Sequence, residues 1–400
     1  MNYDILFLLI FALILLLFYL KNKSKFEIQG KVIALYRTSL GLKLMDKLSN
    51  IPNWLKKTLC YISIFIGFAG MAAIFVLLIQ STWKLIFIPN TPPALAPVLP
   101  GVSIPGLPKL SFFHWIISIF LVATIHEFSH GIFARFFKIK IKSSGFAFFG
   151  PVLAAFVEPS EEEMKKRSKF TQLSVFSAGP FSNIVTGLLL LLISVFLISP
   201  AAASVMEYRG VQIVSLEEGL PASNAGLNVN DQILKINNQN ITDIDIFQDA
   251  FKTISPGDEI EITTQNSTHL VKTIASPSDK DKAYIGVMIA STESGIKESV
   301  SSKFGNFFPM VLIWIAKLFF WLYSISLGIA LFNLLPLGPV DGGRMFYTAL
   351  TFFFSKSPKK VSRIWGGISI LVLLLIVINL MPFILKLLNW IFSPLLSLIL

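Results

Sequence analysis

The sequence predicts a polytopic α-helical membrane protein of about six or seven spans, with a β-rich domain inserted between two of the spans on the extracytoplasmic side. Of its 400 residues, 54% are hydrophobic and 14% are charged, which is far from the composition of a soluble protein. The apolar residues form stretches long enough to cross a bilayer. Residues 205–292 are instead polar and show strand-like alternation with turn pairs.

The positive charge and the single cysteine narrow the classes of function. A net charge of +11 could indicate nucleic-acid binding. The basic residues are concentrated in loops between apolar stretches, however, which indicates membrane orientation. We therefore expect the lipid bilayer as a partner and no nucleic acid. Because Cys60 is the one cysteine, a metal would need His and carboxylate ligands.

The apolar stretches divide the chain into five regions. The first region holds two predicted spans, residues 4–20 and 59–82, with a basic loop between them. The regions are 1–110, which ends in a Pro-rich outer loop, 111–200 and 305–346 as two parts of a membrane core, 205–292 as the inserted domain, and 347–400 with C-terminal membrane helices.

The third predicted span, residues 112–137, contains the motif His-Glu-Phe-Ser-His. Positions four apart lie on one face of a helix, so the imidazoles of His126 and His130 can bind one ion. This is the HExxH arrangement of zinc proteases, in which Glu127 would take a proton from the attacking water. The alternative is two core histidines spaced by chance, which is improbable in a chain with four histidines.

The segment after the third span is apolar, but glycine and proline interrupt it. We predict a re-entrant hairpin over residues 145–163, because irregular backbone at membrane depth is tolerated only against protein or a wet cavity. An exposed edge could pair with an extended substrate strand, and Gly150, Pro151 and Glu158 are candidate substrate-binding residues. The alternative is a surface loop packed on the third span.

The fourth predicted span, residues 171–199, opens with small residues that favour close helix packing. Asn183 is a polar side chain within this span. It either bonds across helices, which is the commoner role, or faces an active site. We retain it as a candidate substrate-binding residue.

The fifth predicted span, residues 308–335, runs into a Pro- and Gly-rich segment. The prolines break the helix and the glycines allow sharp turns, so we expect Asp341 on irregular backbone near the membrane. Asp341 is the best candidate for a third metal ligand; the alternative is a turn or helix-cap Asp. The last apolar segments, 364–382 and 383–400, form a hairpin or one broken unit around Pro382.

The charge of the loops gives a topology that does not depend on the motif. Loops 21–58, 138–170 and 337–363 carry nine, seven and five Lys and Arg residues, whereas loop 83–111 carries two. The inserted domain with its flanks, 201–307, has eight basic and fourteen acidic residues. The positive-inside rule places the basic loops in the cytoplasm and the inserted domain outside. The three candidate ligands then lie at one membrane depth, toward the cytoplasmic side.

Residues 210–240 of the inserted domain resemble a PDZ domain. The resemblance rests on Gly210-Val211-Gln212-Ile213, on Pro221-Ala222 with Ala225-Gly226-Leu227, and on Asp231-Gln232-Ile233-Leu234-Lys235-Ile236-Asn237. It implies that the loop near Tyr208–Val211 would receive a peptide end or a strand. The alternative is an occluded groove in a domain that only fills space.

The HEFSH motif and the later NLLPLGPVDGG together resemble the site-2 protease family of intramembrane metalloproteases. That family pairs HExxH with Asn-x-x-Pro followed by Asp-Gly, which here are Asn333, Pro336, Asp341 and Gly342. The resemblance covers roughly residues 111–345 and includes a re-entrant segment and an extracytoplasmic PDZ insertion. Some bacterial relatives carry two PDZ domains, whereas this chain has one.

The resemblance implies a zinc-dependent intramembrane endopeptidase with one zinc per chain. The zinc ligands would be His126, His130 and Asp341, with Glu127 catalytic and Asn333 orienting the substrate. The expected partners are single-span membrane-protein substrates and an upstream site-1-type protease that makes a first trimming cut in regulated intramembrane proteolysis. The competing classes are a non-proteolytic membrane metal-binding or PDZ-bearing regulatory protein, and a metal transporter.

Overall fold

The computed structural model describes residues 3–29, 33–88, 91, 93–102, 107–149, 152–277 and 279–396. The chain divides into two compact units, which we describe separately. The membrane unit comprises Met1–Val102, Leu110–Ile193 and Leu318–Leu400, and the second unit comprises Ser103–Lys109 and Ser194–Lys317.

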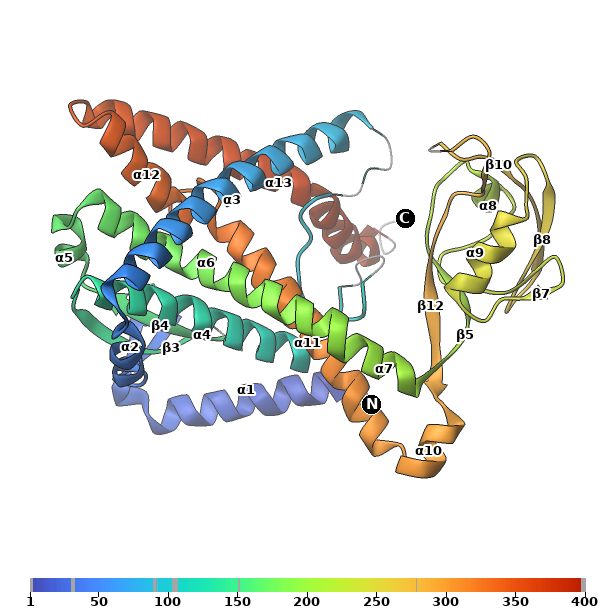
Figure 1. The fold of residues 1–400 in the computed structure, drawn as a ribbon, viewed down its shortest axis with the longest axis horizontal. Coiled ribbons are helices and arrows are strands. Elements are labelled where there is room, and N and C mark those ends of the chain that lie inside the picture. Colours follow the sequence, from blue (N-terminus) through green and yellow to red (C-terminus); the bar gives the residue numbers. More distant parts are fainter. Residues whose placement is uncertain are drawn as a thin grey trace. The chain divides into compact units, whose positions relative to one another are not determined.

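Six helices among the described residues are long and apolar enough to cross a membrane (Figure 1). They are α1 (Tyr3–Lys21), α3 (Asn53–Phe87), α4 (Phe112–Phe136), α6 (Lys169–Ile193), α11 (Phe307–Asn333) and α13 (Pro358–Leu396). After α6 the chain continues through a π-helical turn (Ser194–Ile198) into α7 (Ser199–Val205). The two last apolar segments form the single helix α13, so the described residues contain six candidate spans where six or seven spans were predicted.

The membrane unit buries polar as well as apolar side chains, and it exposes many large apolar ones. Ser63, Ser177 and Ser326 are 0% exposed, whereas Phe65 is 74% exposed. Small side chains let the helix axes approach, and their hydroxyls bond between helices; Ser177 Oγ donates to Ser63 Oγ at 2.9 Å. This distribution is the one expected where lipid chains replace water around a protein.

A four-stranded antiparallel sheet packs on α4, in the order β1-β2-β3-β4. Its strands are β1 (Phe26–Gln29), β2 (Ile33–Thr38), β3 (Ile141–Phe149) and β4 (Val152–Pro159). The predicted hairpin is therefore present as β3 and β4. The prediction missed β1 and β2, because no strand was assigned to the basic loop between the first two spans. The short helices α2 (Leu42–Ser49) and α5 (Glu161–Lys166) pack against α4 and α6 respectively.

Gly145 has a packing role in this sheet. A Cβ at this position would lie 2.1 Å from the carbonyl oxygen of Tyr36 in β2. Only glycine therefore allows β2 and β3 to approach here. The residue that interrupts the apolar pattern in the sequence is one that the sheet requires.

The segment after α11 differs from the prediction. Asp341 is the first residue of helix α12 (Asp341–Phe353) and does not lie on irregular backbone. Cβ atoms on the helical residues Gly342 and Gly343 would lie 2.3 Å from Leu334 O and 2.0 Å from Leu337 O. These glycines thus allow close backbone approach rather than a sharp turn, and they seat the start of α12 against the end of α11.

The second unit contains a β-rich domain with a hydrophobic core, which we call the PDZ-like domain. Its main sheet has the order β12-β5-β6-β8-β9, with β7 paired to β6. The elements are β5 (Met206–Leu216), α8 (Pro221–Asn224), β6 (Gln232–Ile236), β7 (Gln239–Asn240), α9 (Ile244–Lys252), β8 (Glu259–Thr264), β9 (Thr268–Lys272), β10 (Ile274–Ala275), β11 (Ala283–Tyr284) and β12 (Val287–Ile296). Helix α10 (Glu298–Phe304) follows it.

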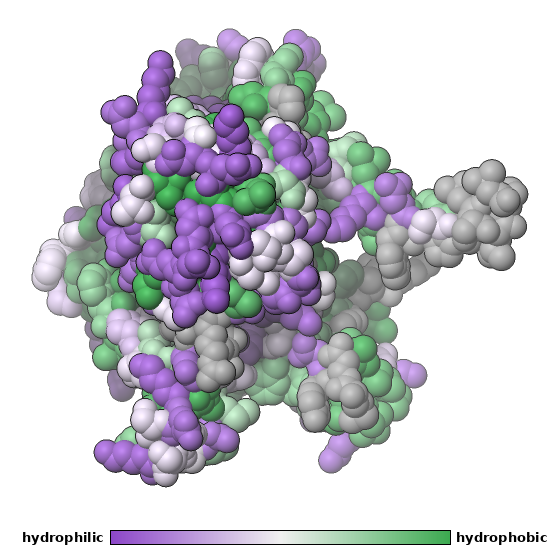
Figure 2. All heavy atoms as spheres, turned by 90° about the vertical axis from the view of Figure 1, so that its right-hand side faces the viewer, coloured by the Kyte–Doolittle hydropathy of each residue, from purple (hydrophilic) through white to green (hydrophobic). Residues whose placement is uncertain are grey.

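The core of the PDZ-like domain follows the alternation seen in the sequence. In β8, Ile260 and Ile262 point inward while Glu259 and Glu261 are exposed. Phe247 of α9 covers this core. The face of the domain seen in Figure 2 is mainly hydrophilic with a few apolar patches, as expected for a domain that folds in water.

Candidate metal centre

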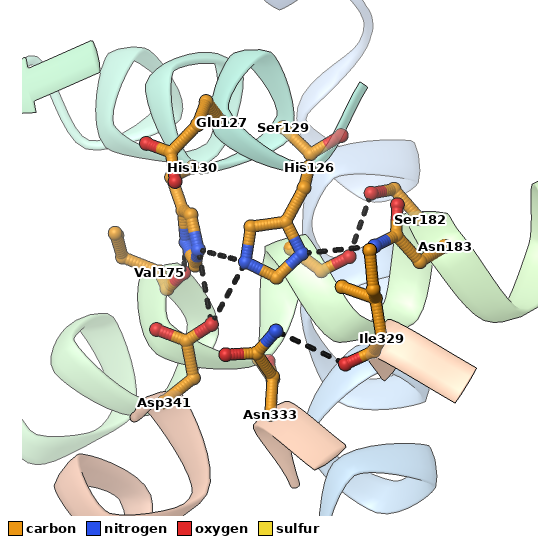
Figure 3. Close-up of polar contacts among 12 residues, drawn as sticks. His126, Glu127, Ser129, His130, Val175, Ser182, Asn183, Ile329, Asn333 and Asp341 are labelled. Atoms are coloured by element: carbon orange, nitrogen blue, oxygen red, sulfur yellow. Dashed lines mark hydrogen bonds and ion pairs between the residues drawn. The ribbon is translucent and has the colours of Figure 1, made fainter. Parts of the chain in front are cut away.

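Three side chains from distant parts of the sequence meet in the membrane unit (Figure 3). The Nε2 atom of His126 lies 3.1 Å from Asp341 Oδ2 and 3.2 Å from His130 Nε2, and His130 Nε2 lies 3.2 Å from the same carboxylate oxygen. These residues are 7–9% exposed. Among the described residues, they form a group whose ligand atoms are close enough to hold one metal ion.

Two helices supply these three groups. His126 and His130 are one turn apart on α4, so their rings project from the same face. Asp341 begins α12, and the close contact of that helix with the end of α11 directs its carboxylate toward the two imidazoles. A carboxylate at a helix N-terminus is also favoured by the helix dipole.

Helix α6 forms the wall on the other side of the imidazoles. Val175, Gly179 and Asn183 are spaced four apart and therefore share one face of this helix. The carbonyl oxygen of Val175 accepts a hydrogen bond from His130 Nδ1 at 2.7 Å. This bond fixes the tautomer of His130, so that its Nε2 lone pair faces the metal position.

The three residues fit a zinc ion. Ligand atoms at about 2.0–2.1 Å from a tetrahedral zinc lie roughly 3.3 Å apart, and the observed separations are 3.1–3.2 Å. A Cβ on Gly179 would lie 2.4 Å from His130 Nε2 and 2.5 Å from His126 Nε2. The missing side chain thus leaves space beside both nitrogens, where an ion can be accommodated.

Glu127 and the three candidate ligands line one cavity of about 950 Å³. A carboxylate oxygen of Glu127 accepts a hydrogen bond from the backbone N–H of Val157 in β4 at 3.3 Å. The cavity wall also includes the charged residues Lys142, Glu158 and Arg344. Water can therefore be stabilised beside a site that is formed by apolar helices.

The predicted substrate-binding residues have different surroundings. Asn333 lines the cavity and donates to the carbonyl oxygen of Ile329 in its own helix at 3.0 Å. Glu158 also lines the cavity. Asn183 is 0% exposed and contacts His126 Nδ1, so it faces a candidate ligand instead of open cavity. Gly150 and Pro151 lie outside the described residues.

Arg37 connects three strands of the sheet beside the cavity. Its guanidinium forms ion pairs with Glu158 in β4 and with Glu27 in β1, and it also donates to Ser143 in β3. The hydrogen bond from Arg37 lowers the pKa of the Glu158 carboxyl from its usual range, so Glu158 is ionised at neutral pH. This network ties the strand that carries Val157 to the N-terminal hairpin.

The PDZ-like domain has a cavity of its own, of about 510 Å³, between α9 and residues 281–287. The segment Tyr208–Val211, predicted to be a receiving loop, is not a loop, because these residues belong to strand β5. That strand pairs with β12 along most of its length and with β6 at Val211 and Gln212. Phe247, Phe251 and Tyr284 are among the residues that line the actual cavity.

Sequence reasoning missed two contributors to the metal centre and one residue of the sheet beside it. Val175 acts through its backbone carbonyl, so its residue type gives no indication of this role. Gly179 was interpreted only as a packing residue; its position four residues from Asn183 was the available signal. Arg37 lies in β2, and the sequence alone does not reveal its contacts because the partner strand β3 is more than a hundred residues away.

Three comparisons with known proteins place the chain in a family. Residues 114–377 match the sequence model of peptidase family M50. An uncharacterized protein of Methanocaldococcus jannaschii is 30% identical over 342 residues, which cover 84% of this chain and 83% of that protein. A protein of Streptococcus pyogenes serotype M6 named "Putative zinc metalloprotease" is 24% identical over 56% of this chain and 62% of its own length.

Among solved structures, the PDZ domain of the SdrC-like protein from Listeria monocytogenes is 22% identical, with a TM-score of 0.19. The match covers 21% of this chain and 90% of that one.

The family match includes both the HExxH helix and the segment around Asp341. The chain therefore belongs to peptidase family M50 and is a membrane zinc metallopeptidase.

Proposed function

We propose that this metallopeptidase is an intramembrane endopeptidase that cleaves the transmembrane segments of single-span membrane proteins. The observation that carries the proposal is the position of the metal centre. The candidate ligands lie on a helix long enough to span a membrane and on the helix that follows another span. They share a cavity with Glu127, so hydrolysis would take place among the spans.

The proposed chemistry assigns one role to each cavity residue. Zinc, when held by His126, His130 and Asp341, polarises the scissile carbonyl and lowers the pKa of a water to about 7. Glu127 takes the proton of the attacking water and then transfers it to the leaving amine. Asn333 keeps an amide oxygen and one N–H for a substrate, because a single N–H is used within its helix.

The substrate would reach this chemistry in an extended form. A helix hides its carbonyls in hydrogen bonds, so a transmembrane segment must unwind before hydrolysis. Strand β4 is at one edge of its sheet, and Val157 in this strand contacts Glu127. Pairing of the unwound segment with β4 would place its backbone beside the catalytic carboxylate.

The test is cleavage of single-span model substrates by the purified full chain, with and without a zinc chelator. We expect cleavage within the apolar segment, loss of activity with chelator and recovery with added zinc. The Glu127→Gln variant keeps the shape of the side chain but cannot take a proton, so it should retain zinc. Its cleavage rate should fall on the order of 10²–10⁴-fold. Wild-type cleavage by this variant would show that Glu127 is not the base.

We infer from the loop charges that the PDZ-like domain is extracytoplasmic and the metal centre lies toward the cytoplasmic side. A cysteine at Asn238 should react with impermeant thiol reagents added to intact cells, whereas one at Asn22 should not. Both would be made after Cys60→Ser. The reverse labelling pattern would overturn this orientation.

The PDZ-like domain is proposed to make cleavage depend on an earlier trimming cut by another protease. Two roles are compatible with this dependence. The domain either excludes membrane proteins that still have large outer domains, or binds the peptide end that trimming exposes. The cavity between α9 and residues 281–287 provides a place for a peptide end, which supports the second role.

Deleting residues 208–291 with a short linker distinguishes these roles. If the domain excludes bulk, the deletion should increase cleavage of substrates with large outer domains and change trimmed ones little. If the domain recruits peptide ends, the deletion should abolish cleavage of trimmed substrates and leave untrimmed ones uncut. Zinc content should be unchanged in both cases, because the ligands all lie in the membrane unit.

A further inference from the structure

We propose that Asn183 is a positioning residue for the metal centre, and that its amide oxygen accepts a hydrogen bond from Nδ1–H of His126. The inference rests on the proposed ligand set of His126, His130 and Asp341. Val175 lies on the same face of α6 and already fixes the imidazole ring of His130. With Asn183 fixing His126, helix α6 would hold both imidazole rings in position.

The tautomer of His126 decides which atom must lie opposite its Nδ1. The Nε2 atom of His126 faces Asp341 and His130, so this nitrogen must offer its lone pair to a metal. A neutral imidazole then carries its proton on Nδ1, which becomes a donor. The side-chain amide of Asn183 lies 3.1 Å from Nδ1, and it can accept this proton only through its oxygen.

Nothing else in the described structure fixes which way the amide of Asn183 is turned. With its nitrogen toward His126, the Oδ1 atom is buried and has no hydrogen-bond partner within the described residues (Figure 3). The oxygen and nitrogen of an amide occupy nearly the same volume, so their positions are assigned from the hydrogen-bond network. The requirement of the imidazole therefore determines the orientation, and it places Oδ1 against Nδ1.

The backbone of Asn183 is held in place independently of its side chain. Its carbonyl oxygen accepts a hydrogen bond from Ser326 Oγ at 2.8 Å, and both residues are 0% exposed. The side chain of Asn183 therefore extends from a fixed backbone position on α6 and contacts His126 on α4. Removing the acceptor would leave Nδ1–H buried without a partner and free the ring to turn.

The experiment compares Asn183→Asp and Asn183→Leu in the purified full chain. Asp has the same shape and is only an acceptor, whereas Leu has similar volume and makes no hydrogen bond. Zinc affinity is measured by competition with a chelator at fixed pH, and the visible spectrum of the Co²⁺-loaded protein reports ligand geometry. We expect Asn183→Leu to lose roughly 10–100-fold in zinc affinity and Asn183→Asp to bind within a few-fold of wild type.

Asn379 provides a matched control in the same membrane unit. It is 0% exposed and its amide bonds to Thr82 and Ser81, away from the metal centre. Asn379→Leu and Asn379→Asp should leave zinc affinity and the Co²⁺ spectrum unchanged, which separates the proposed role from general damage. Unfolding of the zinc-free variants shows whether each one folds.

Two outcomes would overturn the inference. Wild-type zinc affinity in Asn183→Leu would mean that no acceptor is needed. Equal losses in Asn183→Asp and Asn183→Leu would mean that Asn183 acts as a donor or only fills space. Failure of the ligand assignment itself looks different, because His126→Ala would then bind zinc as wild type does.

Discussion

The membrane unit and the PDZ-like domain differ in how many polar side chains they bury among the described residues. In the PDZ-like domain, Ile213 and Ile262 are 0% exposed, and the buried polar side chains among its described residues are few. In the membrane unit, Asn183, Ser326 and Asn379 are 0% exposed, while many large apolar side chains face outward. Water drives apolar groups inward in the first case. In the second, lipid gives no such drive, so packing and hydrogen bonds hold the helices together.

This difference explains where the chemistry lies. Buried polar groups are costly unless they are paired, and the membrane unit concentrates them around one metal centre and a few helix contacts. The cavity of the PDZ-like domain is lined by three aromatic side chains together with aliphatic, polar and charged ones. The four predictions below test this division, from the largest expected effect to the smallest.

The metal ligands should show the largest effect. Replacing His126, His130 or Asp341 with Ala removes one of three ligands, so purified protein should lose its zinc and all cleavage activity. Elemental analysis of the purified variants measures this. Full zinc content in the His126 and His130 variants would contradict the ligand assignment and with it the proposed division between the two regions.

Gly179→Ala should empty the same site without removing any ligand. The added methyl group would lie 2.4–2.6 Å from atoms of both imidazoles, far inside normal contact, so the rings must move apart. Gly328→Ala in α11 is the matched control, because nothing lies within 4 Å of its Cβ position. We expect zinc loss in the first variant and normal zinc in the second. Equal zinc content in both would show that α6 does not limit the space at the metal.

Ile262→Ala tests the conventional core of the PDZ-like domain. This side chain is 0% exposed, and its truncation should destabilise the domain by about 2–5 kcal/mol. Hydrogen exchange of the β8 and β9 amides should accelerate while zinc content is unchanged. Leu270→Ala, at a position that is 65% exposed, should change exchange little. Zinc loss in Ile262→Ala would show that the two regions fold as one.

Glu158→Gln should have the smallest effect. The ion pair with Arg37 is partly exposed, so its loss costs roughly 0–1 kcal/mol. Because the pKa of Glu158 is lowered in the folded protein, the pair stabilises the sheet above the usual carboxyl pKa. This stabilisation by the ion pair is lost as the pH falls through the lowered pKa of Glu158.

Hydrogen exchange of the β4 amides measures this effect. The variant should exchange slightly faster than wild type at neutral pH, and the difference should vanish in acid. Glu161→Gln removes a fully surface-exposed pair with Lys165 and should leave β4 unchanged. A difference between wild type and Glu158→Gln that grows in acid would contradict the assigned direction of the pKa shift.

The sequence by itself determined the features that depend on local pattern. The six candidate spans follow from the length and hydropathy of the apolar stretches. Residues 126–130 alone contain two histidines one turn apart with Glu127 between them, which is the motif of zinc proteases. Alternation predicted the PDZ-like domain and the β3–β4 hairpin, because strand periodicity is visible in any short segment.

Only the tertiary structure decided the features that depend on contacts between distant segments. The hairpin of β1 and β2 joins the sheet because β2 pairs with β3, more than a hundred residues away. Asp341 reaches the histidines because Gly342 and Gly343 let α12 begin against the end of α11. The carbonyl of Val175 and the bare backbone of Gly179 take part through position alone. Such roles cannot be predicted from residue types, because they depend on backbone atoms and on unfilled space that exist at the site only after folding.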